Sequence, residues 1–323
     1  MPRIAASSGE AAASAAEPLA PARATRGVLV PLDGTRLAEE ALAIGASLAR
    51  RAGAPLHLVS AIAPVLEVVR REFPDLVERD VQNETAGRKA YLDRLAEMVR
   101  AIRPGVVTVS VLSGEPGEAI ASYAAHEGVD FIVLATHGRG RMARWCMGSV
   151  ADTLLRRSET PLLLLHVSEE PRLGEYRRIV VGLEGEHDHQ VLDAARRLGS
   201  LSPGAHYVLA GVVEPSVPVL TPLARYPHLA GRHWQARRIS DAEARLGALA
   251  RELEAQGERV TWEVIGRRAV ARALGEIGRS TGADCLVVGT HGLSGVDRAL
   301  LGSVAARLLR ETRLPLLVVP LRS

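Results

Sequence analysis

Residues 290–310 read THGLSGVDRALLGSVAARLLR, and residues 136–156 read THGRGRMARWCMGSVADTLLR. Eleven of the 21 positions are identical, at a constant offset of 154 residues. Each copy follows an apolar run, CLVVG or FIVLA, and contains a glycine-bearing loop, a Gly-Ser pair and an apolar pattern with helical spacing. The chain therefore contains the same strand, loop and helix unit twice.

The duplication extends well beyond this segment. Short apolar runs recur in the same order in each half, separated by segments with helical periodicity. The paired runs are GVLVPL with RIVVGL, PLHLVSAI with HYVLAGVV, VTVSVL with VTWEVI, DFIVLA with DCLVVG, and PLLLLHV with LPLLVV. Strands that alternate with helices predict an α/β fold with right-handed βαβ units. We expect each half to be a Rossmann-like, doubly wound, five-stranded parallel sheet with helices on both faces.

The length of 323 residues suits two domains. We place the first domain at residues 26–167 and the second at residues 177–323, joined by the polar linker 168–176. Residues 1–25 are rich in Ala, Ser and Pro and lack the apolar core of a secretory signal, so we expect a disordered tail there.

One segment in each half interrupts the repeated pattern after the second strand. These segments are residues 64–90 and the Pro-rich residues 215–240. Both follow a strand at its carboxyl end, where ligands of parallel sheets bind. Each segment is therefore either a surface excursion or a flap over a ligand.

The composition excludes several classes of protein. No apolar run approaches the roughly 18–20 residues of a membrane span. The net charge of +3 comes almost entirely from arginines mixed with acids, and aromatic residues make up only 3% of the chain, which argues against nucleic-acid binding. Cys146 and Cys285 have no paired spacing, so neither a disulfide framework nor a zinc site is expected. We expect a cytoplasmic protein.

The repeated segment has the local chemistry of an anion site. In the second copy a strand ends at Gly289, a loop opens with Gly292, and a helix begins at Gly302 and Ser303. Glycine lets a ligand approach the backbone closely, and the free amides of a helix start attract anions. The same residues also suit plain packing and helix capping, so the pattern alone leaves both interpretations open.

The spacing Gly289-x2-Gly292-x9-Gly302-Ser303 resembles the nucleotide-binding motif of the universal stress protein family. The runs LVPLDGT, GSVA and PLLVV also resemble that family, and the resemblance covers about residues 26–167 and 177–320. It implies two such domains that pair within the chain through the edges of their fifth strands as a pseudo-dimer. It also implies a stress-response role with an unidentified protein partner, and an adenine nucleotide site for ATP, with or without Mg²⁺. Further association into a homodimer stays open.

The resemblance assigns a set of ATP-binding positions to each half. In the first domain they are Asp33, Ala61, Ala135, His137, Gly138, Arg141, Gly148, Ser149 and Val150. In the second domain they are Glu184, Val212, Gly289, His291, Gly292, Gly302, Ser303 and Val304.

Each half departs from the family pattern once. Ala135 stands where the motif has glycine, and Glu184 stands where it has aspartate. In the first domain Asp152 lies three residues after Ser149, a capping-box-like arrangement that would compete with a phosphate. Ala306 occupies the equivalent place in the second domain, which leaves that helix start more open.

Two other functions stay open beside the binding of ATP. The same fold with empty sites could act purely as an interaction scaffold, or Asp33 could orient a water for slow ATP hydrolysis. We find no catalytic constellation, neither a Walker lysine motif nor a nucleophile elbow. His187, Asp188 and His189 carry metal-binding groups, but no further ligand cluster accompanies them, so we assign no metal site.

Overall fold

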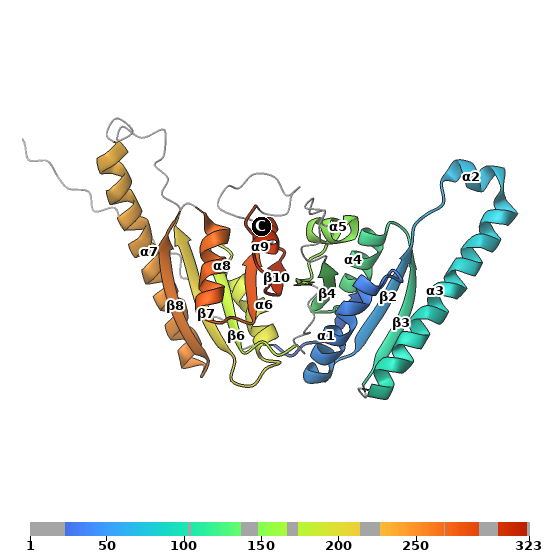
Figure 1. Cartoon of the computed structure of the whole chain (residues 1–323), viewed down its shortest axis with the longest axis horizontal. Helices are drawn as coiled ribbons and strands as arrows, with labels where there is room; N and C mark the ends of the chain where they lie inside the picture. The colour runs from blue at the N-terminus through green and yellow to red at the C-terminus, as the bar shows by residue number, and fades with distance from the viewer. Residues whose placement is uncertain are drawn as a thin grey trace, which may run out of the picture.

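The computed structural model describes residues 23–102, 105–136, 148–166, 174–213, 227–267, 269–290 and 303–321. They form two lobes that share one sheet (Figure 1). The first lobe contains β1 (Val28–Pro31), α1 (Arg36–Ala52), β2 (Leu56–Ile62), α2 (Glu67–Glu72), α3 (Pro74–Ile102), β3 (Val107–Ser113), α4 (Pro116–Glu127), β4 (Phe131–Thr136), α5 (Ser149–Arg157) and β5 (Leu162–His166). The second contains β6 (Arg178–Leu183), α6 (Asp188–Gly199), β7 (His206–Val213), α7 (Pro227–Ala255), β8 (Arg259–Gly266), α8 (Val270–Ser280), β9 (Cys285–Gly289), α9 (Ser303–Glu311) and β10 (Leu316–Val319).

The strand order confirms the expected fold. It runs β3-β2-β1-β4-β5 in the first lobe and continues as β10-β9-β6-β7-β8 in the second. All pairs within a lobe are parallel, whereas β5 and β10 pair antiparallel, with Leu163 opposite Leu317. The two doubly wound sheets thus join edge to edge, and the chain pairs with itself as expected.

The helix α1 shows how the local sequence sets an element's limits. Thr35 caps its start, since its Oγ1 accepts a hydrogen bond from the Ala38 amide at 3.2 Å. Gly53 ends it with a φ of 62°, and its amide donates to the carbonyls of Ala49 and Arg50. This helix therefore begins directly after the loop that follows β1.

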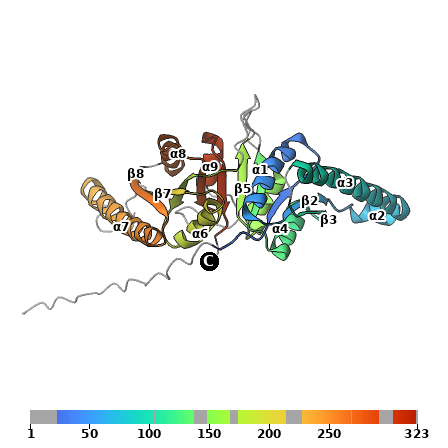
Figure 2. The same ribbon diagram turned by 90° about the horizontal axis from the view of Figure 1, so that it is seen from below.

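Helices cover both faces of the sheet (Figure 2), and an apolar layer lies between the helices and the sheet on each face. Helices α1, α3, α6 and α7 contribute to one layer, and α4, α5, α8 and α9 to the other. Each layer crosses the boundary between the lobes: Leu163 and Leu317 belong to the first, and Leu164 and Leu316 to the second. The lobes therefore share a continuous core. Among the helices of the described residues, none combines the length and apolarity of a bilayer span.

The segment 64–90 is mostly helical. It forms α2 and the first part of α3, which project beyond the sheet (Figure 1). Leu66, Phe73 and Leu76 lie exposed on this projection. Of the segment 215–240, residues 227–240 begin α7, and residues 215–226 lie outside the described ranges.

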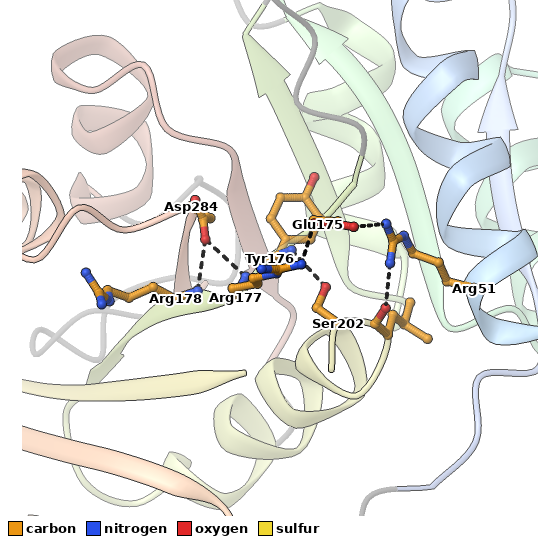
Figure 3. Close-up of polar contacts among 8 residues, drawn as sticks. Arg51, Glu175, Tyr176, Arg177, Arg178, Ser202 and Asp284 are labelled. Atoms are coloured by element: carbon orange, nitrogen blue, oxygen red, sulfur yellow. Dashed lines mark hydrogen bonds and ion pairs between the residues drawn. The ribbon is translucent and has the colours of Figure 1, made fainter. Parts of the chain in front are cut away.

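Residues between the lobes hold them together by polar contacts (Figure 3). Arg51 of α1 pairs with Glu175, and its guanidinium also donates to the Leu201 carbonyl at 3.5 Å. The buried Tyr176 inserts into the shared core, and its amide donates to Ser202 Oγ at 2.9 Å. Tyr176, just before β6, is thus packed between the lobes, and Glu175 beside it contacts α1.

A second polar contact crosses the boundary at Asp130, which is 1% exposed. Its Oδ1 lies 2.8 Å from Arg23 Nη2 and 3.0 Å from Nη1 of Arg197, which belongs to α6 of the other lobe. Its Oδ2 accepts a hydrogen bond from the Arg26 amide at 2.6 Å. One buried carboxylate therefore fixes the start of the first lobe and binds the second.

We expect Asp130→Ala to lower the free energy of unfolding by about 2 kcal/mol, because it removes the charge-assisted hydrogen bonds of this carboxylate to Arg197 and to the Arg26 amide. Urea unfolding monitored by circular dichroism measures this loss. Glu311→Ala is the matched control: it removes the exposed partner of Arg307, at 2.7 Å, and should cost no more than about 0.5 kcal/mol. Equal losses in the two variants would contradict the role given to Asp130.

A buried histidine should make the stability depend on pH. Burial lowers the pKa of His57 below 6.5, its ordinary value, and the nearby Glu127 opposes that shift. The His57 Nδ1 lies 3.1 Å from both the Tyr123 and the Thr108 hydroxyl oxygens. As the pH falls through 6.5, the unfolded chain binds a proton that the folded protein resists, so the stability present above that pH declines.

The variant His57→Gln tests this linkage. Its unfolding free energy should fall less steeply than that of the wild type between about pH 7.5 and 5.5. Urea denaturation at three pH values in that range gives both slopes. A variant with the wild-type slope would show that other groups set the acid sensitivity.

Candidate functional site

The expected ligand positions lie at the carboxyl ends of the strands. In each lobe, successive strands are added first toward one side of the sheet and then toward the other. The switch falls between β1 and β4 in the first lobe and between β6 and β9 in the second. Ligands of doubly wound sheets bind at this place. Six of the expected site residues lie outside the described ranges: His137, Gly138, Arg141, His291, Gly292 and Gly302.

In the first lobe Asp33 lies exposed in the loop after β1. Its Oδ1 accepts hydrogen bonds from the Thr35 amide at 2.9 Å and the Thr35 hydroxyl at 2.6 Å. Between them, Gly34 has a φ of 89°, a conformation that favours glycine. An ionised carboxylate has about four acceptor positions, so these two bonds leave capacity for a ligand's hydroxyl group.

Arg88 of α3 reaches the same loop. Its Nη1 lies 2.7 Å from the Asp33 carbonyl oxygen and 3.4 Å from the hydroxyl of Ser60, which precedes the half-buried Ala61 on β2. Glu84, one turn earlier, lies 3.5 Å from Arg88 Nη2. The guanidinium therefore lies between the ends of β1 and β2. No local pattern indicates this role, because Arg88 is one of many arginines on polar helix faces.

The start of α5 completes the first-lobe position. Gly148 is its N-cap residue, and a Cβ built there would meet no atom of the described residues within 4 Å. Gly148 and Ser149 are exposed, and Val150 is half-buried against the core. At the end of β4, Ala135 is half-buried and also packs against the core. Within the described part of the chain, no side chain caps the start of α5.

The expected capping box at this helix start is wrong. Asp152 instead forms an ion pair with Arg156, with its Oδ2 2.7 Å from Nη2 and 2.9 Å from Nε. The pair lies one turn along α5, because residues four apart share a helix face. Asp152 therefore does not take the place of an incoming anion at Gly148.

In the second lobe, a residue of the chain itself occupies the loop after the first strand. Asp188, at the start of α6, accepts hydrogen bonds on Oδ1 from the amides of Glu184 and Gly185, at 2.9 and 2.8 Å. Its Oδ2 lies 2.9 Å from Arg245 Nε on α7. Asp188 is 3% exposed, and burial raises the pKa of its carboxyl, against the opposing effects of Arg245 and the two amides.

The contacts of Asp188 argue against a role for this carboxylate in metal binding. Its oxygens are directed to the backbone and to Arg245, while Glu184 lies exposed beside them. Within the described ranges, no three His, Cys, Asp or Glu side chains gather as a metal site. The residue at the equivalent place in the first lobe is Leu37, so the closed loop belongs to the second lobe alone.

The strand-terminal glycine of the second lobe serves packing. A Cβ on Gly289 would lie 2.6 Å from Leu321 Cδ1. The Leu321 amide donates to Thr290 Oγ1 at 3.1 Å, which holds that side chain over the strand end. Of the other expected positions, Val212 is buried and Val304 is half-buried, just inside α9, which begins at Ser303. The space that the missing Cβ leaves is thus filled by Leu321.

Comparison with known proteins gives a consistent picture. The model of the universal stress protein family matches residues 25–166 and 175–320. Universal stress protein Rv2005c of Mycobacterium tuberculosis is 28% identical over 314 residues, which cover 92% of this chain and 97% of that protein. Universal stress protein Rv1996 of the same organism is 23% identical over 315 residues, covering 90% and 94%.

Solved structures support the same fold. The crystal structure of a universal stress protein from Archaeoglobus fulgidus superposes with a TM-score of 0.66 at 16% identity, covering 91% of this chain and 98% of that one. A putative universal stress protein from Pseudomonas aeruginosa superposes with a TM-score of 0.55 at 17% identity, covering 92% and 94%. Since the family model matches both halves, the chain belongs to the universal stress protein family and contains two of its domains.

Proposed function

We propose that this protein binds ATP in its first lobe and that nucleotide occupancy regulates its contacts with a protein partner. One observation carries the choice of lobe. The loop after β1 presents the exposed Asp33 beside Arg88, whereas the equivalent loop after β6 is filled by the buried Asp188.

The first-lobe groups suit the parts of a nucleotide. Asp33 can accept hydrogen bonds from ribose hydroxyls, and the start of α5 at Gly148 offers amide donors and the positive end of the helix dipole to phosphates. The guanidinium of Arg88 has five donors, of which the contacts to the Asp33 carbonyl and Ser60 use only part. A Mg²⁺ ion that accompanies ATP would be held mainly by phosphate oxygens and water.

The second lobe favours a different role. Displacing Asp188 would leave two loop amides without their acceptor and Arg245 without its ion-pair partner, which opposes ligand entry. The filled loop and the Leu321 side chain over Gly289 support the alternative that this lobe acts as a scaffold. Hydrolysis of ATP is a further alternative for the first lobe, where Asp33 could position a water, although positioning alone gives slow rates.

Calorimetric titration of the full chain with Mg-ATP tests the proposal. We expect one nucleotide per chain, and we expect Asp33→Ala to weaken binding about tenfold or more, since a hydrogen bond to a charged group contributes roughly 1.5–3 kcal/mol. The matched control is Glu184→Ala, which changes the equivalent residue of the second lobe and should leave affinity and stoichiometry unchanged.

Three outcomes would contradict the proposal. Two nucleotides per chain, or an equal loss in both variants, would show that the second lobe also binds. No binding, together with no nucleotide released from freshly purified denatured protein in mass spectrometry, would favour the scaffold function for both lobes.

A further inference from the structure

A surface pocket of about 430 Å³ lies on the second lobe, at the amino ends of its strands. This is the opposite end of the strands from the candidate nucleotide site. Its lining comes from the residues that precede or begin β6, β7, β8 and β9: Arg177, Arg178, Pro203, Gly204, His206, Arg259, Gly282 and Asp284. Figure 3 shows Arg177, Arg178 and Asp284 at this edge of the sheet.

Three basic residues form a row across this edge. Arg178, His206 and Arg259 are the first residues of β6, β7 and β8, and the strand register places Arg178 beside His206 and His206 beside Arg259. Neighbouring residues in register on parallel strands point to the same face, at a spacing of about 4.8 Å. The row therefore places three nitrogen-bearing side chains side by side across roughly 10 Å.

Arg178 and His206 of the row contact neutral groups. Arg178 donates to the Thr281 carbonyl at the end of α8, which is a neutral acceptor. The His206 Nε2 lies 3.1 Å from Thr261 Oγ1, also a neutral group. Burial lowers the pKa of His206, and the charges of Arg178 and Arg259 lower it further, as expected at a point of positive potential.

The acid in the pocket is already engaged with the backbone. Asp284 Oδ2 accepts hydrogen bonds from the amides of Arg177 and Arg178, at 3.0 and 2.9 Å. The Arg177 guanidinium lies 3.3 Å from the carboxylate of Glu175, a residue that does not line the pocket. Asp284 therefore fixes the strand start and offsets only part of the charge of the row.

The first lobe shows that the fold does not require this row. By the same register, Gly27, Pro55 and Val106 occupy the places of Arg178, His206 and Arg259. The acid that corresponds to Asp284 is Asp130, which Arg23 and Arg197 cover. The basic row thus belongs to the second lobe only.

We propose that this row binds a phosphate group, free or as the monoester of a small metabolite. Arginine side chains form paired hydrogen bonds with phosphate oxygens, and two of them flanking an imidazole can surround a tetrahedral dianion. Gly204 and Gly282 line the pocket without side chains, and its volume leaves room for an organic group beside the phosphate. The site is independent of the nucleotide proposed for the first lobe.

Histidine NMR on the full-length protein tests the site directly. Adding inorganic phosphate should raise the pKa of His206, because a bound anion favours the imidazolium form. Calorimetry at low salt should show that Arg259→Val, which installs the first-lobe residue, weakens phosphate binding about tenfold or more. Because Arg259 is exposed at a strand start, we expect the variant to keep the wild-type melting temperature.

A control variant separates this site from general electrostatic attraction. Arg272→Ala removes an exposed arginine of α8 that pairs with Glu276, and it should leave phosphate binding unchanged. An equal loss in Arg272→Ala, or a His206 pKa that does not respond, would overturn the proposal. Glycerol 3-phosphate that binds more tightly than inorganic phosphate would identify a monoester, and equal affinities would identify free phosphate.

Discussion

The antiparallel pairing of β5 with β10 is the contact on which the rest of the structure depends. Both strands are apolar on both faces, and an unpaired edge would expose their amides and carbonyls to water. Pairing satisfies these groups and merges the two apolar layers across the boundary. Asp130 with Arg197, and Arg51 with Glu175, then fix the angle between the lobes from outside the core. The duplicated chain thus provides its own dimer partner.

A fused partner frees the two copies to diverge at the ends of their strands, where packing no longer demands identical residues. At the carboxyl ends the first lobe has Leu37 where the second has Asp188, so only the second loop is closed by its own acid. At the amino ends the second lobe again has the charged residue, here a base: Gly27 in the first lobe corresponds to Arg178 in the second. The apolar interiors of the two sheets stay alike, and the two lobes differ in the charged residues at both ends of their strands.

Much of the fold was predictable because it depends on periodic apolar patterns. The ten strands follow the paired apolar runs, since strands covered on both faces read as continuous hydrophobic segments. The polar roles were less predictable. Arg88 reaches Asp33 across 55 residues of sequence, and no local pattern encodes such a contact. Asp152 could either cap the start of α5 or pair with Arg156, four residues further on, and it forms the ion pair. Asp188 lies between two histidines, a pattern that can bind a metal, yet its carboxylate accepts hydrogen bonds from the amides of Glu184 and Gly185.

The closed loop of the second lobe has an energetic logic. Asp188 is tethered next to the amides that it binds, so it acts at a far higher effective concentration than any free ligand. Its burial against Arg245 adds to this advantage, because removing one partner from a buried ion pair leaves an uncompensated charge. A ligand that competes for this loop must offset both terms, whereas the equivalent loop of the first lobe has Leu37 in that place and leaves Asp33 exposed. The same loop therefore supports structure in one lobe and leaves room for a ligand in the other.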